Sequence, residues 1–433
     1  MRAALLSLNR YLGAELFPAQ QGFWQLLPLA LIHVIALGIM VWSEFTPPNA
    51  LAFLFAWLFL NGLWLLLCRR PAVAGAASLV MISLLVLLSQ LKFHVLLLTA
   101  NFVDLMIVDT DTVAFLFGIY PQLYWIVSLS VLILVPLIVL LWRIEPLRIS
   151  RPIAAVLTLC AFGGMIAVGR LYPMAPTDAW YGSNYVSSFV RSGVGAISDL
   201  MTRGIIEAGP PTLDHLLPAA DWSCRPARTP PHIILIHDES SFDIRMAPGI
   251  KVPDGYGAHF KSFDGKERNF LAEGNGGPSW YTEYNVLEGL SARSFGDFSF
   301  FVTRIAAHHV YRGLPAALQR CGYRTFSLYP ALGAFMSARS YQSTTGVEHF
   351  YDRDDLKADA VEPDSFFYDK AAKIIEREHG SSPMFVYIYL DANHFPWDYR
   401  LRPDLLPQWK DPGNGPLVDE YLRRQELSAQ NYQ

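Results

Sequence analysis

Residues 232–237 read His-Ile-Ile-Leu-Ile-His, a short apolar run that is followed directly by two acidic residues, Asp238 and Glu239. Such a run between turn-forming residues is typical of a buried strand. Similar runs occur at 325–329 and 384–390. Stretches of helical period lie among them at 280–290, 311–321 and 364–378. Strands that alternate with helices predict an α/β domain whose mostly parallel sheet is covered on both faces.

The polar residues after the first and third predicted strands form a candidate site. Asp238 and Glu239 follow one strand, and Asp391, Asn393 and His394 follow the other. Parallel sheets bind ligands at the carboxyl ends of their strands, so we expect these side chains to meet there. Glu239 is the candidate ligand of a divalent cation, and His394 could hold a phosphate oxygen or a leaving group. The alternatives are a surface carboxylate and a hydrogen-bonded loop histidine.

Two further side chains are candidates for covalent chemistry and phosphate binding. Residues 273–280 read Glu-Gly-Asn-Gly-Gly-Pro-Ser-Trp and place Ser279 in a glycine-rich turn before a helical stretch. A hydroxyl there becomes a nucleophile when a metal or base activates it, and the helix start favours phosphate. An N-cap serine would look the same in the sequence, and Thr282 is the fallback nucleophile. Arg339 could bind a phosphate through its planar guanidinium group, or could be a solvated surface charge.

The N-terminal part of the chain has the composition of a membrane protein. The whole chain is 52% hydrophobic and only 17% charged, and the charge is concentrated outside residues 1–171. A span needs about 20 mostly apolar residues. Five stretches qualify, at 23–42, 50–68, 72–91, 122–142 and 152–170.

Segment 93–121 is the ambiguous part of the membrane half. It carries Asp104, Asp109 and Asp111, and carboxylates at mid-membrane are costly, so we expect a re-entrant or interfacial segment rather than a sixth span. The acids could form a cation or headgroup site, or simply a solvated loop face. With five spans, Lys and Arg gather on one side, which the positive-inside rule assigns to the cytoplasm. Residues 171–433 are then exported.

The linker and the domain boundaries follow from changes in composition. Residues 178–208 suit an amphipathic helix that lies on the membrane surface, and glycine and proline breaks follow it. We therefore divide the chain into a transmembrane domain at 1–171, a juxtamembrane linker at 172–230 and a catalytic domain at 231–433.

The four cysteines separate into two pairs. Cys68 and Cys160 lie in predicted spans and suit packing. Cys224 and Cys321 lie in the exported part, where an oxidising compartment permits a disulfide. The sequence leaves this bridge open, because it does not show whether the two residues lie within bonding reach.

The exported half resembles the sulfatase-like domain of lipoteichoic acid synthases and related membrane phosphoglycerol and phosphoethanolamine transferases, within the alkaline phosphatase superfamily. The resemblance covers nearly the whole chain and is strongest at 231–243, 274–291, 337–352 and 384–397. It implies an N-terminal membrane domain of five spans and an extracytoplasmic α/β catalytic domain. It also implies that the protein is a multi-pass protein of the bacterial inner membrane with a periplasmic C-terminal domain.

The resemblance gives roles to individual residues. Ile236-His-Asp-Glu239-Ser is similar to the family strand that ends in a metal-binding Glu. Gly277-Pro-Ser279-Trp-Tyr-Thr-Glu283-Tyr is similar to the nucleophile segment, in which the family usually has Thr. Arg339, followed by Gly346-Val-Glu-His-Phe-Tyr-Asp352, resembles the substrate-binding Arg segment, and Asn393-His394-Phe-Pro resembles the headgroup-binding His. Glu239 and Ser279 would thus hold one divalent metal, with Mn²⁺ or Mg²⁺ favoured over Ca²⁺ or Zn²⁺.

The chain also departs from the family pattern. Pro330 stands where the family has a His after the strand, so headgroup specificity is expected to differ. The family completes its metal site with an Asp-His pair beyond the Asn-His-Phe-Pro motif, and no such pair occurs between His394 and Gln433. We therefore expect a catalytic domain that is truncated at its C-terminus.

These observations leave three hypotheses for function. The first is a transferase that moves a phosphoryl headgroup from a membrane phospholipid to an envelope glycan through an ester on Ser279. The second is a sulfatase or phosphodiesterase with the same site, although Ser279-Trp-Tyr-Thr lacks the Pro and Arg of the sulfatase motif. The third is a truncated, non-catalytic membrane protein. The net charge of −4 gives no indication of a nucleic acid partner.

Overall fold

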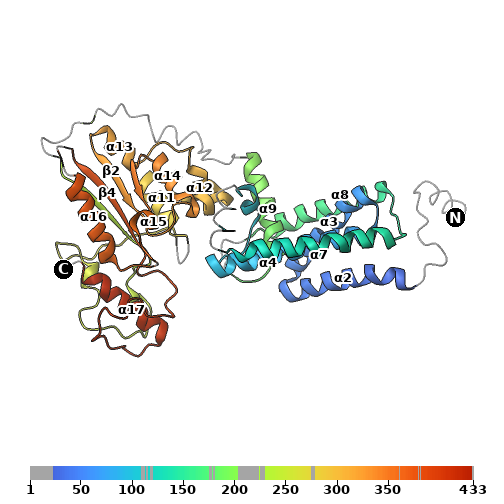
Figure 1. The fold of residues 1–433 in the computed structure, drawn as a ribbon, viewed down its shortest axis with the longest axis horizontal. Helices are drawn as coiled ribbons and strands as arrows, with labels where there is room; N and C mark the ends of the chain where they lie inside the picture. Colours follow the sequence, from blue (N-terminus) through green and yellow to red (C-terminus); the bar gives the residue numbers. More distant parts are fainter. Residues whose placement is uncertain are drawn as a thin grey trace, which may run out of the picture. The chain divides into compact units, whose positions relative to one another are not determined.

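The computed structural model divides the chain into two compact units, Met1–Thr202 and Arg203–Gln433. Figure 1 shows the elements of both. The structure describes residues 23–108, 113, 116–117, 120–174, 178, 181–202, 224, 230–274, 278–359, 361–378, 380 and 382–431.

The first unit is a set of long apolar helices. Within its described residues, five are long and apolar enough to cross a membrane, as the sequence predicts. They are α2 (Phe23–Ser43), α3 (Pro47–Cys68), α4 (Pro71–Leu96), α7 (Gln122–Ile144) and α8 (Arg151–Leu171). Proline begins both α3 and α4, where its missing N–H leaves no hydrogen bond unmade.

The structure describes part of the acidic segment after α4. α4 continues to Leu96, beyond the predicted end at residue 91, and a five-residue helix, α5 (Phe102–Met106), follows it. The carboxylate of Asp104 accepts hydrogen bonds from Lys92 Nζ at 2.8 Å and completes a capping box with Asn101. These contacts give Asp104 a role in the local fold. Asp109 and Asp111 lie outside the described residues.

Helix α9 (Tyr185–Thr202) falls within the predicted amphipathic stretch but belongs to the first unit. It packs on α3 and α8, and Val186 and Val190 join the buried cluster of this unit. The carboxylate of Glu44 accepts hydrogen bonds from the N–H groups of Val186 and Ser187 at the start of the helix. The first half of α9 is therefore buried against other helices, while Ile197, Leu200 and Met201 near its end are exposed.

The second unit is built on a four-stranded parallel sheet in the order β1-β4-β2-β3. The strands are β1 (Ile233–Asp238), β2 (Arg324–Leu328), β3 (His349–Tyr351) and β4 (Met384–Leu390). The helices are α11 (Trp280–Glu288), α12 (Val302–Ala306), α13 (Leu314–Arg320), α14 (Ala338–Thr344), α15 (Arg353–Leu356), α16 (Asp364–Glu378) and α17 (Pro416–Ala429). The predicted α/β architecture is confirmed. Among the four strands, only the three-residue β3 is absent from the sequence prediction, and the short helices α12, α14 and α15 were not predicted either.

The two faces of the sheet differ in character. Alternate strand residues, including Phe326, Val386 and Ile388, pack against Phe367 and Ile374 of α16 and form the main apolar core. The helices α11 and α14 lie on the opposite side of the sheet (Figure 1). The side chains that alternate with the core residues, among them the tyrosines of β4, point to that other face. The candidate site lies beside this more polar face of the sheet.

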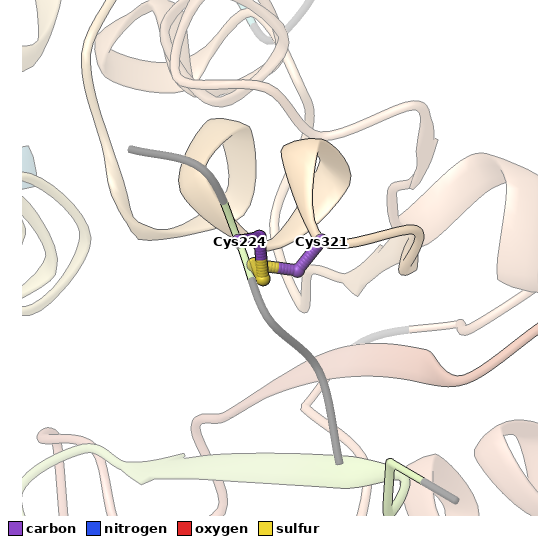
Figure 2. Close-up of a disulfide and its surroundings, with 2 residues drawn as sticks. All are labelled: Cys224 and Cys321. Carbon is purple, nitrogen blue, oxygen red and sulfur yellow. A yellow bond between two sulfur atoms is a disulfide. The ribbon is translucent and has the colours of Figure 1, made fainter. Parts of the chain in front are cut away.

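Cys224 and Cys321 form a disulfide with an S–S distance of 2.08 Å and a Cα–Cα distance of 5.2 Å (Figure 2). Cys321 follows α13, and the bridge joins positions that are 97 residues apart in the sequence. It therefore ties the chain that precedes β1 to the helix that precedes β2. The sequence left this pairing open, and the geometry supplies it.

The disulfide should stabilise the second unit, because a cross-link over a long loop reduces the entropy of the unfolded chain. Cys321→Ser should lower its free energy of unfolding by about 2–4 kcal/mol. Denaturant titration of the detergent-solubilised full chain would measure the change, with Cys160→Ser in α8 as a control that leaves it unaltered. A wild-type protein that titrates with four free thiols under denaturing, non-reducing conditions would contradict the bridge.

Candidate active site

The ends of β1 and β4 bring Glu239 and His394 together. The two strands pair in parallel register, with Asp238 opposite Leu390, and the N–H of Glu239 donates to the carbonyl of Leu390 at 3.2 Å. His394 Nε2 lies 3.4 Å from Glu239 Oε1. The Glu239 side chain is 12% exposed and that of His394 is 51% exposed. Glu239 therefore lies on the buried side of the pair and His394 on the solvent side. A ligand can reach it from solvent.

The loop that carries His394 is fixed by its neighbour Asn393. The Asn393 side chain is fully buried and donates to Asp238 Oδ1 at 3.1 Å and to Ser428 Oγ at 3.0 Å. The N–H of His394 donates to the carbonyl of Asp391 at 2.9 Å, which closes a turn. Asn393 therefore connects β1, the loop after β4 and α17. The amide nitrogen of its side chain thus has a structural role in holding this loop.

Further carboxyl groups lie behind the Glu239–His394 pair. Burial raises the pKa of Asp391 to about 8, with smaller contributions from the carboxyl groups of Glu239 and Asp364. Burial likewise raises the pKa of Asp364 to about 7, with a contribution from Asp238. Both carboxyl groups thus hold a proton near neutral pH far more readily than in water. This end of the sheet concentrates oxygen donors in a site of low dielectric.

Ser279 stands directly before α11, at the helix start that the sequence predicts. It is half-buried, and within the described residues its hydroxyl makes no capping hydrogen bond to the helix. Its carbonyl accepts the N–H of Glu283 at 3.1 Å. The structure therefore does not use Ser279 as a side-chain N-cap, which was the alternative to a nucleophile. The fallback nucleophile, Thr282, is only 8% exposed.

The turn before Ser279 requires glycine at one described position. A Cβ on Gly274 would lie 2.7 Å from the carbonyl oxygen of Pro278, a distance that backbone atoms do not tolerate. Glycine there lets the chain fold back on itself just before the helix. Residues 275–277, which include two of the glycines quoted above, lie outside the described residues.

Glu283 is a buried acid that the sequence reasoning did not single out. It lies one turn after Ser279, and its Oε1 accepts a hydrogen bond from Gln342 Nε2 of α14 at 2.7 Å. Burial raises its pKa to about 8, and the charge of Glu239 acts in the same direction. The helix that begins at Ser279 is therefore coupled electrostatically to Glu239. The spacing of Glu283 from Ser279 is visible in the sequence. The buried hydrogen bond of Glu283 depends on Gln342 from a helix that is distant in the sequence.

Three buried tyrosines, Tyr329, Tyr387 and Tyr389, lie near enough to these acids to be affected by their charge. Burial raises the pKa of each hydroxyl well above its usual range, and the charges of Glu239 and Glu283 add to the effect. The hydroxyls remain protonated and can donate hydrogen bonds. His237 is different, because burial lowers its pKa to about 4 and leaves the ring neutral, with Nδ1 2.7 Å from the hydroxyl oxygen of Tyr387.

Arg339 lies at the start of α14, and its guanidinium is held by protein groups. Its Nη2 contacts Asp352 Oδ2 at 2.6 Å and Asp355 Oδ2 at 2.7 Å, and its Nη1 donates to the carbonyl of Phe350 at 3.1 Å. The structure thus joins Arg339 to β3 and α15. Its role in phosphate binding stays a prediction.

The residues around Glu239 fit part of a divalent cation site. Asp391 Oδ1 is buried and has no hydrogen-bond partner among the described residues, and the largely buried Glu239 is near enough for its charge to raise the pKa of Asp391. Carboxylate and hydroxyl oxygens are the donors that Mg²⁺ and Mn²⁺ prefer. Across the described residues, no three His, Cys, Asp or Glu side chains gather closely enough to hold a metal. The fit therefore rests on donor chemistry at Glu239 and not on a complete ligand set.

Comparison with known proteins finds a family model that matches part of the chain. Residues 281–424 match the family model described as Sulfatase, a range that includes Arg339 and His394 and begins just after Ser279. No match was found among curated proteins. A similar solved structure is that of the lipoteichoic acid synthase LtaP from Listeria monocytogenes, with 15% identity and a TM-score of 0.36. The alignment covers 46% of this chain and 50% of that one, so the chain spans about half of that structure's length.

Proposed function

We propose that this chain, whose residues 281–424 match the sulfatase family model, is a membrane-anchored transferase that acts on phospholipid headgroups. The observation that carries the proposal is the meeting of Glu239 and His394 at the strand ends, together with the electrostatic effect of Glu239 on Glu283 in the helix that follows Ser279. Ser279 has a half-buried hydroxyl that the helix does not use. Such a hydroxyl suits a nucleophile, and an exposed imidazole edge suits a ligand for phosphoryl oxygens.

The reaction would proceed in two steps. Ser279 Oγ attacks the phosphorus of the lipid phosphodiester, and the bond from phosphorus to the diacylglycerol oxygen breaks. The proton that the serine loses is matched by the one that the diacylglycerol oxygen gains. In the second step a glycan hydroxyl attacks the phosphoryl-serine ester, receives the headgroup and regenerates Ser279.

The chain's own groups would divide the work between them. His394 would orient a phosphoryl oxygen through Nε2, and the neutral tyrosines would exclude water from the inner side of the site. A divalent cation held at Glu239, Mn²⁺ or Mg²⁺ by donor chemistry, would supply charge stabilisation and lower the pKa of the attacking hydroxyl.

The membrane helices explain why a lipid is the proposed donor. A chain with five helices able to span a bilayer would be confined to the surface where phospholipid is abundant. By the positive-inside rule the site would face the exterior of a bacterial inner membrane. The proposed acceptor is accordingly a glycan of the cell envelope.

The test uses the purified full chain in detergent with Mn²⁺ and with phosphatidylglycerol or phosphatidylethanolamine that carries a fluorescent acyl chain. We expect metal-dependent release of fluorescent diacylglycerol from one of these lipids and no release of sulfate from an aryl sulfate ester. Release of sulfate without diacylglycerol would favour the sulfatase alternative. Absence of turnover on every substrate, with or without metal, would favour the non-catalytic one.

A further inference from the structure

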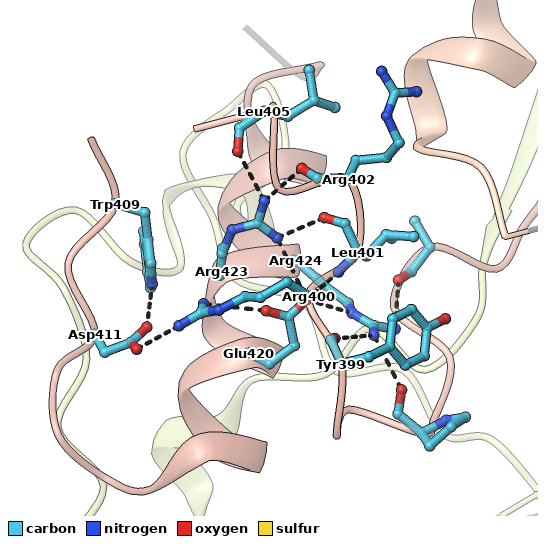
Figure 3. Close-up of polar contacts among 12 residues, drawn as sticks. Tyr399, Arg400, Leu401, Arg402, Leu405, Trp409, Asp411, Glu420, Arg423 and Arg424 are labelled. Atoms are coloured by element: carbon cyan, nitrogen blue, oxygen red, sulfur yellow. Dashed lines mark hydrogen bonds and ion pairs between the residues drawn. The ribbon is translucent and has the colours of Figure 1, made fainter. Parts of the chain in front are cut away.

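Helix α17 holds the loop that carries His394 through one fully buried arginine, Arg424 (Figure 3). Its two terminal nitrogens donate only to backbone carbonyls of that loop. The acceptors are Ala392 at 3.4 Å, His394 at 2.9 Å, Pro396 at 3.1 Å and Tyr399 at 3.2 Å. One planar group thus fixes four points of a segment that has no regular secondary structure.

The burial of Arg424 is compensated in full. Its Nε donates to Glu420 Oε1 at 3.0 Å, and Glu420 is itself 2% exposed. The guanidinium also stacks over the ring of Tyr399, with 4.8 Å from its central carbon to the ring centroid. Burying a charge pair costs desolvation free energy. This cost is offset where every donor of the pair has an acceptor. This set of hydrogen bonds therefore requires a guanidinium group.

The neighbouring Arg423 holds a different part of the same loop. It donates to the carbonyls of Leu401, Arg402 and Leu405, each at 2.8 Å, and is 3% exposed. Both arginines share Glu420. The two residues match in type, helix, burial and charge partner, and they differ in whether they reach the backbone of His394.

The His394 ring has little side-chain support of its own. Within the described residues its nitrogens contact Glu239 and the carbonyl of Phe395, and half of the side chain is exposed. The direction of the ring is therefore set mainly by the backbone that carries it. Arg424 holds that backbone at the carbonyl of His394 itself.

We propose that Arg424 is a positioning residue, which orients His394 toward Glu239 by its bond to the His394 carbonyl and so controls binding of the lipid headgroup. The inference rests on the proposed function of His394. A small displacement of a binding group costs up to about a hundredfold in rate, so loss of this bond should have a measurable effect. Lysine at position 424 would keep the charge beside Glu420 but could not span four carbonyls from a single nitrogen.

The experiment compares Arg424→Lys with Arg423→Lys in the detergent-solubilised full chain. For Arg424→Lys we expect kcat/KM for fluorescent phosphatidylglycerol or phosphatidylethanolamine to fall about 10- to 100-fold, with the larger part of the change in KM. Arg423→Lys should remain within about threefold of wild type. Backbone amide hydrogen exchange should become faster at residues 392–399 in Arg424→Lys and at residues 401–405 in Arg423→Lys. This measurement reports the order of the loop independently of activity.

A double-mutant cycle separates positioning from general stability. If Arg424 acts through His394, then Arg424→Lys should add less than about a twofold loss to that of His394→Ala. Equal losses in both arginine variants, or full additivity with His394→Ala, would overturn the proposal. Unchanged kinetics in His394→Ala itself would instead refute the proposed function of His394. If Arg424→Lys does not fold, Arg424→Gln, which keeps a planar head with two donors, should give the same order of effects.

Discussion

Ser279→Ala should reduce the release of diacylglycerol from the donor lipid by at least about a thousandfold, because it removes the oxygen that would form the phosphoryl ester. The half-buried hydroxyl makes no helix-capping bond among the described contacts, so its loss should cost little stability. The effect should therefore be confined to the rate. Labelling of the protein by a radioactive lipid headgroup, followed by mass spectrometry of the labelled peptide, would measure the ester directly.

Two matched substitutions sharpen this result. Ser279→Thr keeps a hydroxyl at the same position and should retain activity, since the resembling family usually has Thr there. Thr282→Ala removes the other hydroxyl of the segment and should leave labelling intact, because Thr282 is almost fully buried. Undiminished labelling of Ser279→Ala would refute the assignment of Ser279. Loss of labelling in Thr282→Ala alone would move the nucleophile to Thr282.

The parts of the fold that the sequence predicts are those with a strong local pattern. The strands β1, β2 and β4 are apolar runs with β-branched or aromatic residues, and α16 has a clear helical period that gives its bounds at residues 364 and 378. Strand β3 has only three residues, too few for any period to emerge. The convergence of Glu239 and His394 follows from parallel pairing, which brings neighbouring strand ends to one edge.

The parts that the sequence does not predict depend on distant partners. Glu283 becomes a buried, hydrogen-bonded acid because Gln342 of another helix reaches it. No sequence pattern singled out the charged residues of α17, yet Glu420, Arg423 and Arg424 are buried. Charged side chains are rarely buried unless they are paired, and their partners here are loop carbonyls that carry no sequence signal. Periodicity finds elements, but it does not find a polar network of this kind.

Glu239→Gln should weaken the binding of Mn²⁺ by about a hundredfold or more and should lower the metal-dependent rate by a similar factor. The amide keeps the shape of the side chain but removes the negative charge that a divalent cation needs. Wild-type protein at a Mn²⁺ concentration of about 100 times Kd should gain about 2.7 kcal/mol of stability, and the variant should lose most of this gain. Calorimetric titration and thermal unfolding with Mn²⁺ report the binding even where turnover is absent.

The matched control is Glu283→Gln, which tests whether charge or mere polarity matters at this end of the sheet. With a pKa of about 8, Glu283 is mostly protonated at pH 7, so an amide there replaces a group that is already neutral. Mn²⁺ affinity should therefore stay within about threefold of wild type in Glu283→Gln. If both variants bound Mn²⁺ as wild type does, Glu239 would not be a ligand. If both lost it equally, the site would need the buried acid as an anion, and the proposed division between a charged Glu239 and a neutral Glu283 would fail.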